Sequence, residues 1–275
     1  MTAGLYVVAT PIGNARDISL RGLDVLKGCD VICAEDTRVT SKLLAIHGIA
    51  RPLAAYNDHN APEMRPKILA RLERGEAVVL VSDAGTPLVS DPGYKLVREV
   101  IAHGMPVIAI PGASAVLAGL ASSGLPSDRF VFAGFLSSRA GERKTALEEL
   151  KGVRATLIFF ESAQRLDDSL AAMAEVLGDR ACVVARELTK LHEETRRGLL
   201  SQLAAHYAGA GAPRGEVTVL VGPPAEAAPD TAKLDAALKA ALAFMPVKAA
   251  AEMIAHLTDG SRKAIYARAL ELKDE

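Results

Sequence analysis

Residues 77–93 read AVVLVSDAGTPLVSDPG, and this stretch carries the pattern that sets the fold class. Its first five residues are apolar, as expected of a strand that is buried on both faces of a sheet. A turn with glycine and proline follows at 82–87, and Asp91-Pro92 then has the form of an N-cap with proline at the first helical position. The stretch therefore predicts a buried strand, a turn, and a helix that ends at Gly104.

Similar apolar runs recur along the chain, and most are separated by amphipathic segments that end at glycine. The strands expected from these runs cover residues 5–9, 30–34, 77–81, 106–110, 156–160, 181–185 and 217–221. The expected helices cover residues 19–27, 40–47, 62–74, 92–103 and 165–177. Residues 104–127 carry no charge, but their prolines and glycines predict a buried strand, a turn and a buried helix rather than a membrane span. Strands that alternate with helices predict an α/β protein with at least partly parallel sheets.

The composition limits the classes to which this protein can belong. A length of 275 residues suggests about two domains. The 32 basic and 33 acidic residues nearly balance, which argues against a strongly basic nucleic-acid coat and a polybasic membrane binder. Tryptophan is absent and aromatic residues make up 4%, so a platform that stacks several bases is not expected. Three cysteines without a CxxC pair and six histidines without metal-ligand spacing argue against disulfides and a metal, and fit a reducing cytosol.

The C-terminal part of the chain has a different pattern. Residues 223–230, PPAEAAPD, have the composition of a linker. Three short helices are expected beyond it, at 231–244, 247–257 and 261–272, and the last two are joined as tightly as in a helix-turn-helix. Acidic and basic residues are nearly equal in number in this tail, so a small helical cap or a dimer element is an equally good interpretation.

Three turns that contain glycine or proline directly follow predicted strands, at 10–14, 82–87 and 111–115. In open α/β sheets, ligands bind at the carboxyl ends of the strands, and glycine there allows the backbone to approach a ligand closely. Three such turns on one sheet predict a nucleotide-like ligand. None of them is a phosphate loop or a GxGxxG fingerprint, which disfavours an ATPase and a standard dinucleotide enzyme. Asp83 in the second turn could receive a ribose hydroxyl or simply cap the turn.

Charged residues directly follow three other predicted strands. A carboxylate at a strand end can act as a general base or as a hydrogen-bond anchor, and an arginine can orient it or hold a phosphate. A structural Asp–Arg pair explains part of the pattern equally well. The catalytic candidates are Glu35, Asp36, Arg38, Glu161, Arg186 and Glu187.

Seven motifs occur in a fixed order along the chain: LYVVATPIGNARDIS, ICAEDTR, VVLVSDAGTPLVSDPG, IPGASAVLAGLASSGLP, FFES, ARELTK and GEVTVLVG. In this combination the chain resembles, end to end, the ribosomal RNA small subunit methyltransferase I family of the tetrapyrrole methylase superfamily. The resemblance implies two α/β domains, at 1–118 and 119–224, with a cofactor cleft between them, and a small helical tail at 225–275. It also implies S-adenosylmethionine as cofactor, no metal, and 2′-O-methylation of cytidine 1402 in 16S rRNA of the small ribosomal subunit. A cytoplasmic homodimer without membrane contact is expected on the same ground.

The resemblance also assigns residues to the cofactor cleft. By motif these are Pro11, Ser82, Asp83, Ala84, Gly85, Thr86, Ser114, Ala115, Glu161 and Glu216. Motif matching does not choose a general base among Glu35, Asp36, Glu161 and Glu187. The chain departs from the family after FFES, where Gln164 stands in place of a common histidine, and we interpret this as a substitution at the start of a helix. Two alternatives remain open: a tetrapyrrole methyltransferase, and a non-catalytic, cofactor-binding module for ribosome assembly.

Overall fold

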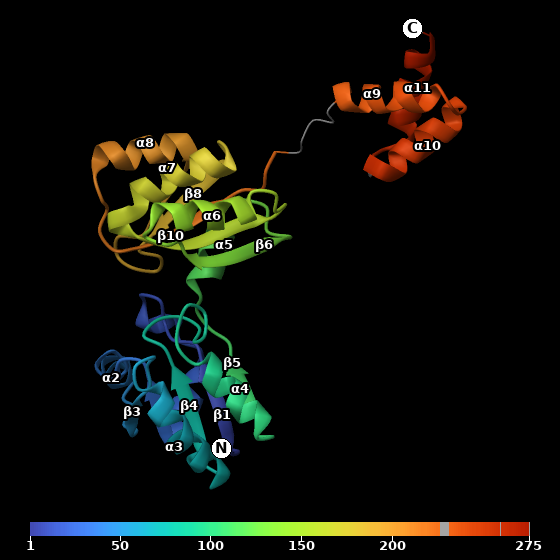
Figure 1. The fold of residues 1–275 in the computed structure, drawn as a ribbon. Coiled ribbons are helices and arrows are strands. Elements are labelled where there is room, and N and C mark those ends of the chain that lie inside the picture. Colours follow the sequence, from blue (N-terminus) through green and yellow to red (C-terminus); the bar gives the residue numbers. More distant parts are fainter. Residues whose placement is uncertain (226–230, 259, 275) are drawn as a thin grey trace. The chain divides into compact units, whose positions relative to one another are not determined.

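The computed structural model in Figure 1 describes residues 1–225, 231–258 and 260–274. The chain forms two compact units, Met1–Pro224 and Ala225–Glu275. Most of the linker predicted at 223–230 lies outside the described residues. The predicted α/β architecture with a helical C-terminal region is confirmed.

The first sheet of the larger unit is parallel throughout and has the strand order β3-β2-β4-β1-β5. Its strands are β1 (Gly4–Val8), β2 (Val31–Ala34), β3 (Leu53–Ala55), β4 (Ala77–Val81) and β5 (Val107–Ile110). Its helices are α1 (Leu20–Gly28), α2 (Thr37–Ile46), α3 (Ala61–Glu73) and α4 (Tyr94–Ala102), with a short 3-10 turn, η1 (Ala15–Asp17), before α1.

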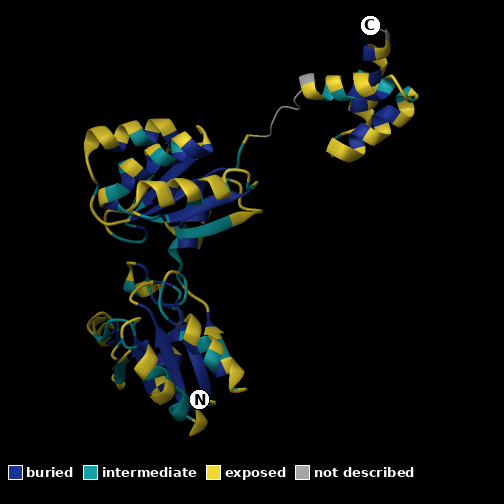
Figure 2. Cartoon of the chain, in the orientation of Figure 1, coloured by how far each residue is buried: buried dark blue, intermediate teal, exposed yellow. Residues whose placement is uncertain are grey.

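Helices cover both faces of this sheet, which explains its uninterrupted apolar strands. Along β4, Val79 and Val81 pack into the core beside α1 and α2, while Val78 and Leu80 pack into the core beside α3 and α4. Figure 2 shows these strands as buried and the outer helix surfaces as exposed. The parallel sheet predicted from the alternating pattern is thus confirmed.

The second sheet is mixed and has the order β6-β7-β10-β8-β9, with β6 and β7 parallel and the other neighbours antiparallel. Its strands are β6 (Phe130–Phe135), β7 (Thr156–Ser162), β8 (Ala181–Arg186), β9 (Glu194–Leu199) and β10 (Glu216–Val221). Its helices are α5 (Ala115–Ser123), α6 (Ala140–Leu150), α7 (Leu166–Leu177) and α8 (Leu200–Ala210), with a 3-10 turn, η2 (Ala163–Arg165), before α7.

Helix α5 connects the two sheets. It follows β5 of the first sheet, yet it packs under the second sheet, on the face opposite to α6, α7 and α8 (Figure 1). Gly119 allows this close approach, because a Cβ there would lie 3.4 Å from the side chains of both Leu220 and Thr218 on β10. The start of α5 therefore lies at the junction of the two sheets.

The helix after β4 begins later than predicted. We expected Asp91-Pro92 to start it, but α4 begins after Gly93, which is its N-cap with a φ of 136° and no side-chain capping bond. The physical reason is the loop before it, in which Leu88 and Ser90 adopt left-handed φ values of 75° and 65°. The carboxylate of Asp91 is consequently left available for another role.

The tail unit consists of α9 (Thr231–Leu242), α10 (Val247–Thr258) and α11 (Arg262–Asp274), as the sequence predicted. Leu238, Ile254 and Ile265 contribute one side chain from each helix to its small core. Arg268 on α11 pairs with Asp235 on α9 at 2.5 Å. Among the described residues, no helix has the length and apolar character needed to cross a membrane.

Candidate functional site

The three turns singled out in the sequence meet at one edge of the first sheet, because β4, β1 and β5 are neighbours. Thr10 and Gly85 exchange backbone hydrogen bonds of 2.8 and 3.0 Å, which join the first turn to the second. The Thr86 hydroxyl donates to the carbonyl of Ala113 at 3.2 Å, which joins the second turn to the third. Gly85 has a φ of 79°, a conformation that favours glycine. The predicted convergence of the three turns is confirmed.

A cavity of about 780 Å³ opens at this edge, between the three turns and the second sheet. From the first sheet and the start of α5 it is lined by Ile12, Ala84, Gly85, Thr86, Val89, Ser90, Asp91, Ser114 and Ala115. From the second sheet and its loops it is lined by Phe135, Phe160, Glu161, Ser162, Ala163, Gln164, Ala212, Pro213, Arg214, Gly215, Glu216, Val217 and Thr218.

Seven of the ten cofactor residues expected by motif line this cavity. They are Ala84, Gly85, Thr86, Ser114, Ala115, Glu161 and Glu216. The other three, Pro11, Ser82 and Asp83, line an adjoining hollow of about 280 Å³. Ala84 and Glu216 border both spaces. The assignment of these ten residues to cofactor binding stays a prediction.

The turn after β2 carries Glu35, Asp36 and Arg38, and none of these three residues lines the cavity. Asp36 accepts hydrogen bonds from two nitrogens of the Arg38 side chain, Nε at 3.0 Å and Nη2 at 2.6 Å, and this pairing lowers the pKa of Asp36 to about 2. The backbone N–H of Asp36 donates to Asp83 at 2.9 Å. Burial raises the pKa values of Glu35 and Asp83. Asp36 and Arg38 therefore form the structural pair that the sequence left open.

Glu161 is fully committed to contacts inside the protein. Its side chain has 0% exposure and pairs with Arg165 at 2.7 Å. The hydroxyl of Ser169 and the backbone N–H of Ser162 each donate to it at 2.6 Å. These partners occupy both carboxylate oxygens, so Glu161 anchors the start of α7 and is poorly placed to accept a further proton.

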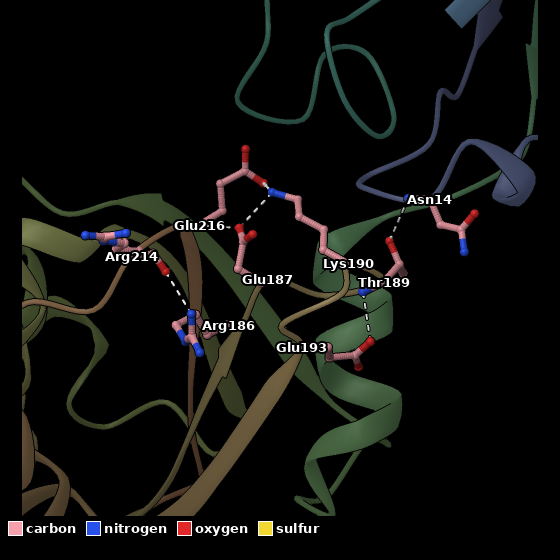
Figure 3. A network of polar contacts seen from close by, with 8 residues as sticks. All are labelled: Asn14, Arg186, Glu187, Thr189, Lys190, Glu193, Arg214 and Glu216. Atoms are coloured by element: carbon pink, nitrogen blue, oxygen red, sulfur yellow. Dashed lines mark hydrogen bonds and ion pairs between the residues drawn. The ribbon is translucent and has the colours of Figure 1, made fainter. Parts of the chain in front are cut away.

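Arg186 and Glu187 belong to the polar network shown in Figure 3. Arg186 donates to Glu194 and to the carbonyl of Arg214. Glu187 pairs with Lys190 at 2.8 Å, and this contact lowers the pKa of Glu187. The candidate residues here are thus held in structural pairs.

The same network joins the second sheet to the first turn. Lys190 also pairs with Glu216 at 3.1 Å, and the N–H of Asn14 donates to the Thr189 hydroxyl at 3.2 Å (Figure 3). Gly13 permits this contact, because a Cβ there would lie 2.4 Å from Cγ of Lys190. The network therefore fixes the turn after β1 against the far side of the cavity.

Asp91 is an ionisable site residue that the sequence interpretation missed. It lines the cavity, and burial raises the pKa of its carboxyl to about 6. Glu35 and Asp83 raise it further by repulsion, and a hydrogen bond from Ser82 partly opposes this. Asp91 lies in the SDPG sequence at residues 90–93, but the sequence analysis interpreted it as a helix N-cap and not as a site residue. Gln164 also lines the cavity, from η2 before α7, and its interpretation as a substitution at a helix start stays a prediction.

Comparison with known proteins identifies the class to which this fold and cavity belong. The family model described as Tetrapyrrole (Corrin/Porphyrin) Methylases matches residues 4–204. The structure of a cobalt precorrin-4 methyltransferase matches with a TM-score of 0.61 and 20% identity, over 79% of this chain and 94% of that one. A diphthine synthase structure matches with a TM-score of 0.62 and 17% identity, over 79% of this chain and 89% of that one. The chain therefore belongs to the tetrapyrrole methylases.

Closer relatives define a particular family within this class. Several curated relatives carry the name ribosomal RNA small subunit methyltransferase I. The one from Mesorhizobium japonicum is 55% identical, over 98% of this chain and 92% of the relative. The one from Erythrobacter litoralis is 53% identical, over 99% of this chain and 96% of the relative. The one from Pseudomonas aeruginosa is 44% identical, over 98% of this chain and 98% of the relative. A model described as RsmI C-terminal HTH domain matches residues 228–273.

The chain belongs to the ribosomal RNA small subunit methyltransferase I family, as the motifs indicated. It is a methyltransferase, and S-adenosylmethionine is its methyl donor. The cavity fits this cofactor in size, since small-molecule sites commonly measure about 300–1,000 Å³. Ile12, Val89 and Val217 provide apolar walls for a purine, and the N-terminus of α5 at Ala115 suits a carboxylate. In the part of the chain that the structure describes, no group of three or more His, Cys, Asp or Glu could hold a metal ion.

Proposed function

We propose that this protein transfers a methyl group from S-adenosylmethionine to the 2′-oxygen of cytidine 1402 in 16S rRNA of the small ribosomal subunit. The observation that carries the proposal is the 55% identity to a ribosomal RNA small subunit methyltransferase I over 98% of this chain. The match includes the tail, where the matching family model is described as RsmI C-terminal HTH domain. Precorrin and diphthine enzymes share the fold but are only 17–20% identical. The alternative of a tetrapyrrole substrate has no comparable support.

The reaction moves a methyl group from a sulfonium sulfur to a ribose oxygen, and the bound cofactor supplies that activated methyl group. The main task of the protein is alignment, because positioning alone can contribute much of the rate of such a displacement. We assign this task to the three turns, which are joined by the backbone hydrogen bonds between Thr10 and Gly85 and by the hydrogen bond from Thr86 to Ala113. The Lys190 network supports the opposite wall of the cavity.

A neutral 2′-hydroxyl is a weak nucleophile, so a carboxylate that accepts its proton would increase the rate. Asp91 suits this role best, because it lines the cavity and burial raises its pKa to about 6. Asp36, Glu161 and Glu187 are each engaged by a basic partner. Glu35 has a raised pKa but does not belong to the cavity wall. The proton of the hydroxyl would thus pass to a carboxylate oxygen of Asp91.

Three further expectations form part of the proposal. The first is a homodimer in the cytoplasm. The second is a division into an N-terminal domain at 1–118, a second domain at 119–224 and a tail at 225–275. The third is that the ten motif residues form the cofactor site. The tail could contact either RNA or a second copy of the protein. Crosslinking of the chain to small ribosomal subunits would distinguish the two.

The test is methylation of small ribosomal subunits that lack the modification, with tritiated S-adenosylmethionine as donor. Nuclease digestion would then map the label. We expect a single 2′-O-methylcytidine at position 1402. Calorimetry would establish cofactor binding in parallel, and a known methyltransferase on the same particles would serve as the control. Cofactor binding without labelled RNA would overturn the assignment and favour a tetrapyrrole substrate or a non-catalytic assembly module.

A further inference from the structure

An exposed phenylalanine stands at the edge of the cavity. Phe135 is the last residue of β6, it lines the cavity, and 57% of its surface is exposed. Its ring meets that of Phe160 edge to face, with centroids 5.6 Å apart and an angle of 61°. Phe160 in turn meets Phe132 at 4.8 Å. Three of the six phenylalanines of the chain thus form one aromatic cluster, and two of them, Phe135 and Phe160, line the cavity.

A β-bulge directs the ring of Phe135 toward the cavity. Phe132 pairs with Ile158 and Phe135 pairs with Phe160, so three steps along β6 correspond to two along β7. The extra residue therefore brings Phe132 and Phe135 to the same face, which regular alternation would not do. Gly134 makes the bulge possible with a φ of 67°. Bulges that redirect a side chain are common beside active sites.

Packing alone does not account for this ring. An aromatic side chain contributes most to stability when it is buried, and more than half of this one remains open. Phe160 supports it from one side, and the remaining surface is available to a ligand in the cavity. An aromatic ring held in this way is a suitable surface for another flat ring.

We propose that Phe135 is the platform on which the base of the target nucleotide stacks while its ribose enters the cavity. The inference rests on the proposed function. A nucleotide whose sugar is modified inside a cavity must leave its neighbours, and proteins commonly hold such unstacked bases against aromatic side chains. A single ring can hold a single base, which agrees with the small aromatic content of the chain. Because phenylalanine offers no polar group, it positions the base without selecting cytosine by hydrogen bonds.

The test compares substitutions at this position in the full-length protein. Phe135→Ala and Phe135→Leu both remove the ring, and Phe135→Tyr keeps it. Phe130→Ala is the matched control, because Phe130 lies at the other end of the same strand, is 42% exposed, and does not line the cavity. For each variant we would measure the KM for small ribosomal subunits, kcat, and the Kd for S-adenosylmethionine by calorimetry. Circular dichroism would confirm that each variant is folded.

We expect the alanine and leucine variants to raise the KM for the subunit by roughly 5- to 150-fold, the range of stacking one base on one ring. Their Kd for the cofactor should stay at the wild-type value, and the tyrosine and Phe130→Ala variants should behave like the wild type. Wild-type kinetics in Phe135→Leu would overturn the inference, as would an equal loss of cofactor affinity in Phe135→Ala. Absence of methylation by the wild type would overturn the proposed function, and this inference with it.

Discussion

Replacing Asp91 by asparagine is expected to stabilise the folded protein while it removes methyl transfer. The two effects have one cause. Burial raises the pKa of this carboxyl from 3.8 to about 6, so at neutral pH the folded state carries an ionised group in an unfavourable place. Asparagine has nearly the same shape and no charge. It relieves the electrostatic cost and cannot accept the proton of a ribose hydroxyl.

The magnitude follows from the change in pKa. A rise from 3.8 to about 6 corresponds to at most roughly 3 kcal/mol of folding free energy at neutral pH. The carboxylate borders an open cavity, and solvent screening therefore weakens the effect by about half. The expected gain in folding free energy is about 1–2 kcal/mol. The folded state binds the proton more tightly than the unfolded state, so the wild type loses this stability as pH rises through about 6. The advantage of the variant should accordingly be absent below about pH 4, grow between about pH 4 and pH 6, and stay at its full size above pH 6.

Thermal unfolding of the full chain without cofactor, at pH 4.5 and pH 7.5, measures this difference. Asp24→Asn is the matched control, since Asp24 is an exposed carboxylate on α1 outside the cavity. In the methylation assay, loss of a general base is expected to lower kcat by about 10²- to 10⁴-fold. The wild-type rate should rise with pH through about 6. A less stable Asp91→Asn protein at pH 7.5 would refute the burial argument, and a fully active one would refute the catalytic role.

Three further predictions concern the framework of the cavity. Glu161→Ala leaves Arg165 without its buried partner and should lower the free energy of unfolding by about 3–5 kcal/mol in urea titrations; an unchanged midpoint would contradict the anchoring role. Gly13→Ala places a Cβ 2.4 Å from Cγ of Lys190, so it should lower the free energy of unfolding by about 1–3 kcal/mol and weaken cofactor binding in calorimetry. Gly141→Ala is the control, because a Cβ there meets no atom within 4 Å, and it should change neither quantity. The three buried thiols, whose pKa values burial raises to about 11–12, should react with a disulfide reagent at pH 8 only after denaturation; rapid labelling of the native protein would contradict their burial.

Four of the five strands of the first sheet, β1, β2, β4 and β5, were predictable because each is a local feature. Runs such as Ala77–Val81 combine apolar residues with a following glycine turn, and they need no distant partner to be recognised. The strands that escaped prediction lack this pattern. β9 (Glu194–Leu199) is a polar edge strand, β3 (Leu53–Ala55) has three residues, and β6 (Phe130–Phe135) is interrupted by its bulge. Helices α6 (Ala140–Leu150) and α8 (Leu200–Ala210) also escaped prediction.

The candidate site was predictable in its location and not in its chemistry. Strand ends on a parallel sheet meet at one edge, so the three turns could be brought together from sequence alone. Whether a particular carboxylate is free depends on its neighbours in space. Asp36 is neutralised by Arg38 and Glu161 by Arg165, although both looked available along the chain. Asp91 looked like a helix cap and lines the cavity instead.

The amino-acid sequence by itself determined which segments become buried strands and turns, their α/β order, and the family to which the chain belongs. These properties depend on short-range patterns of apolar residues, glycine and proline. Only the tertiary structure decided that Asp91 and Phe135 line the cavity. The first depends on left-handed residues that delay a helix, and the second on a bulge that shifts the register against β7. Both are long-range outcomes, because pairing between strands and burial of charge arise from residues that are distant in the chain.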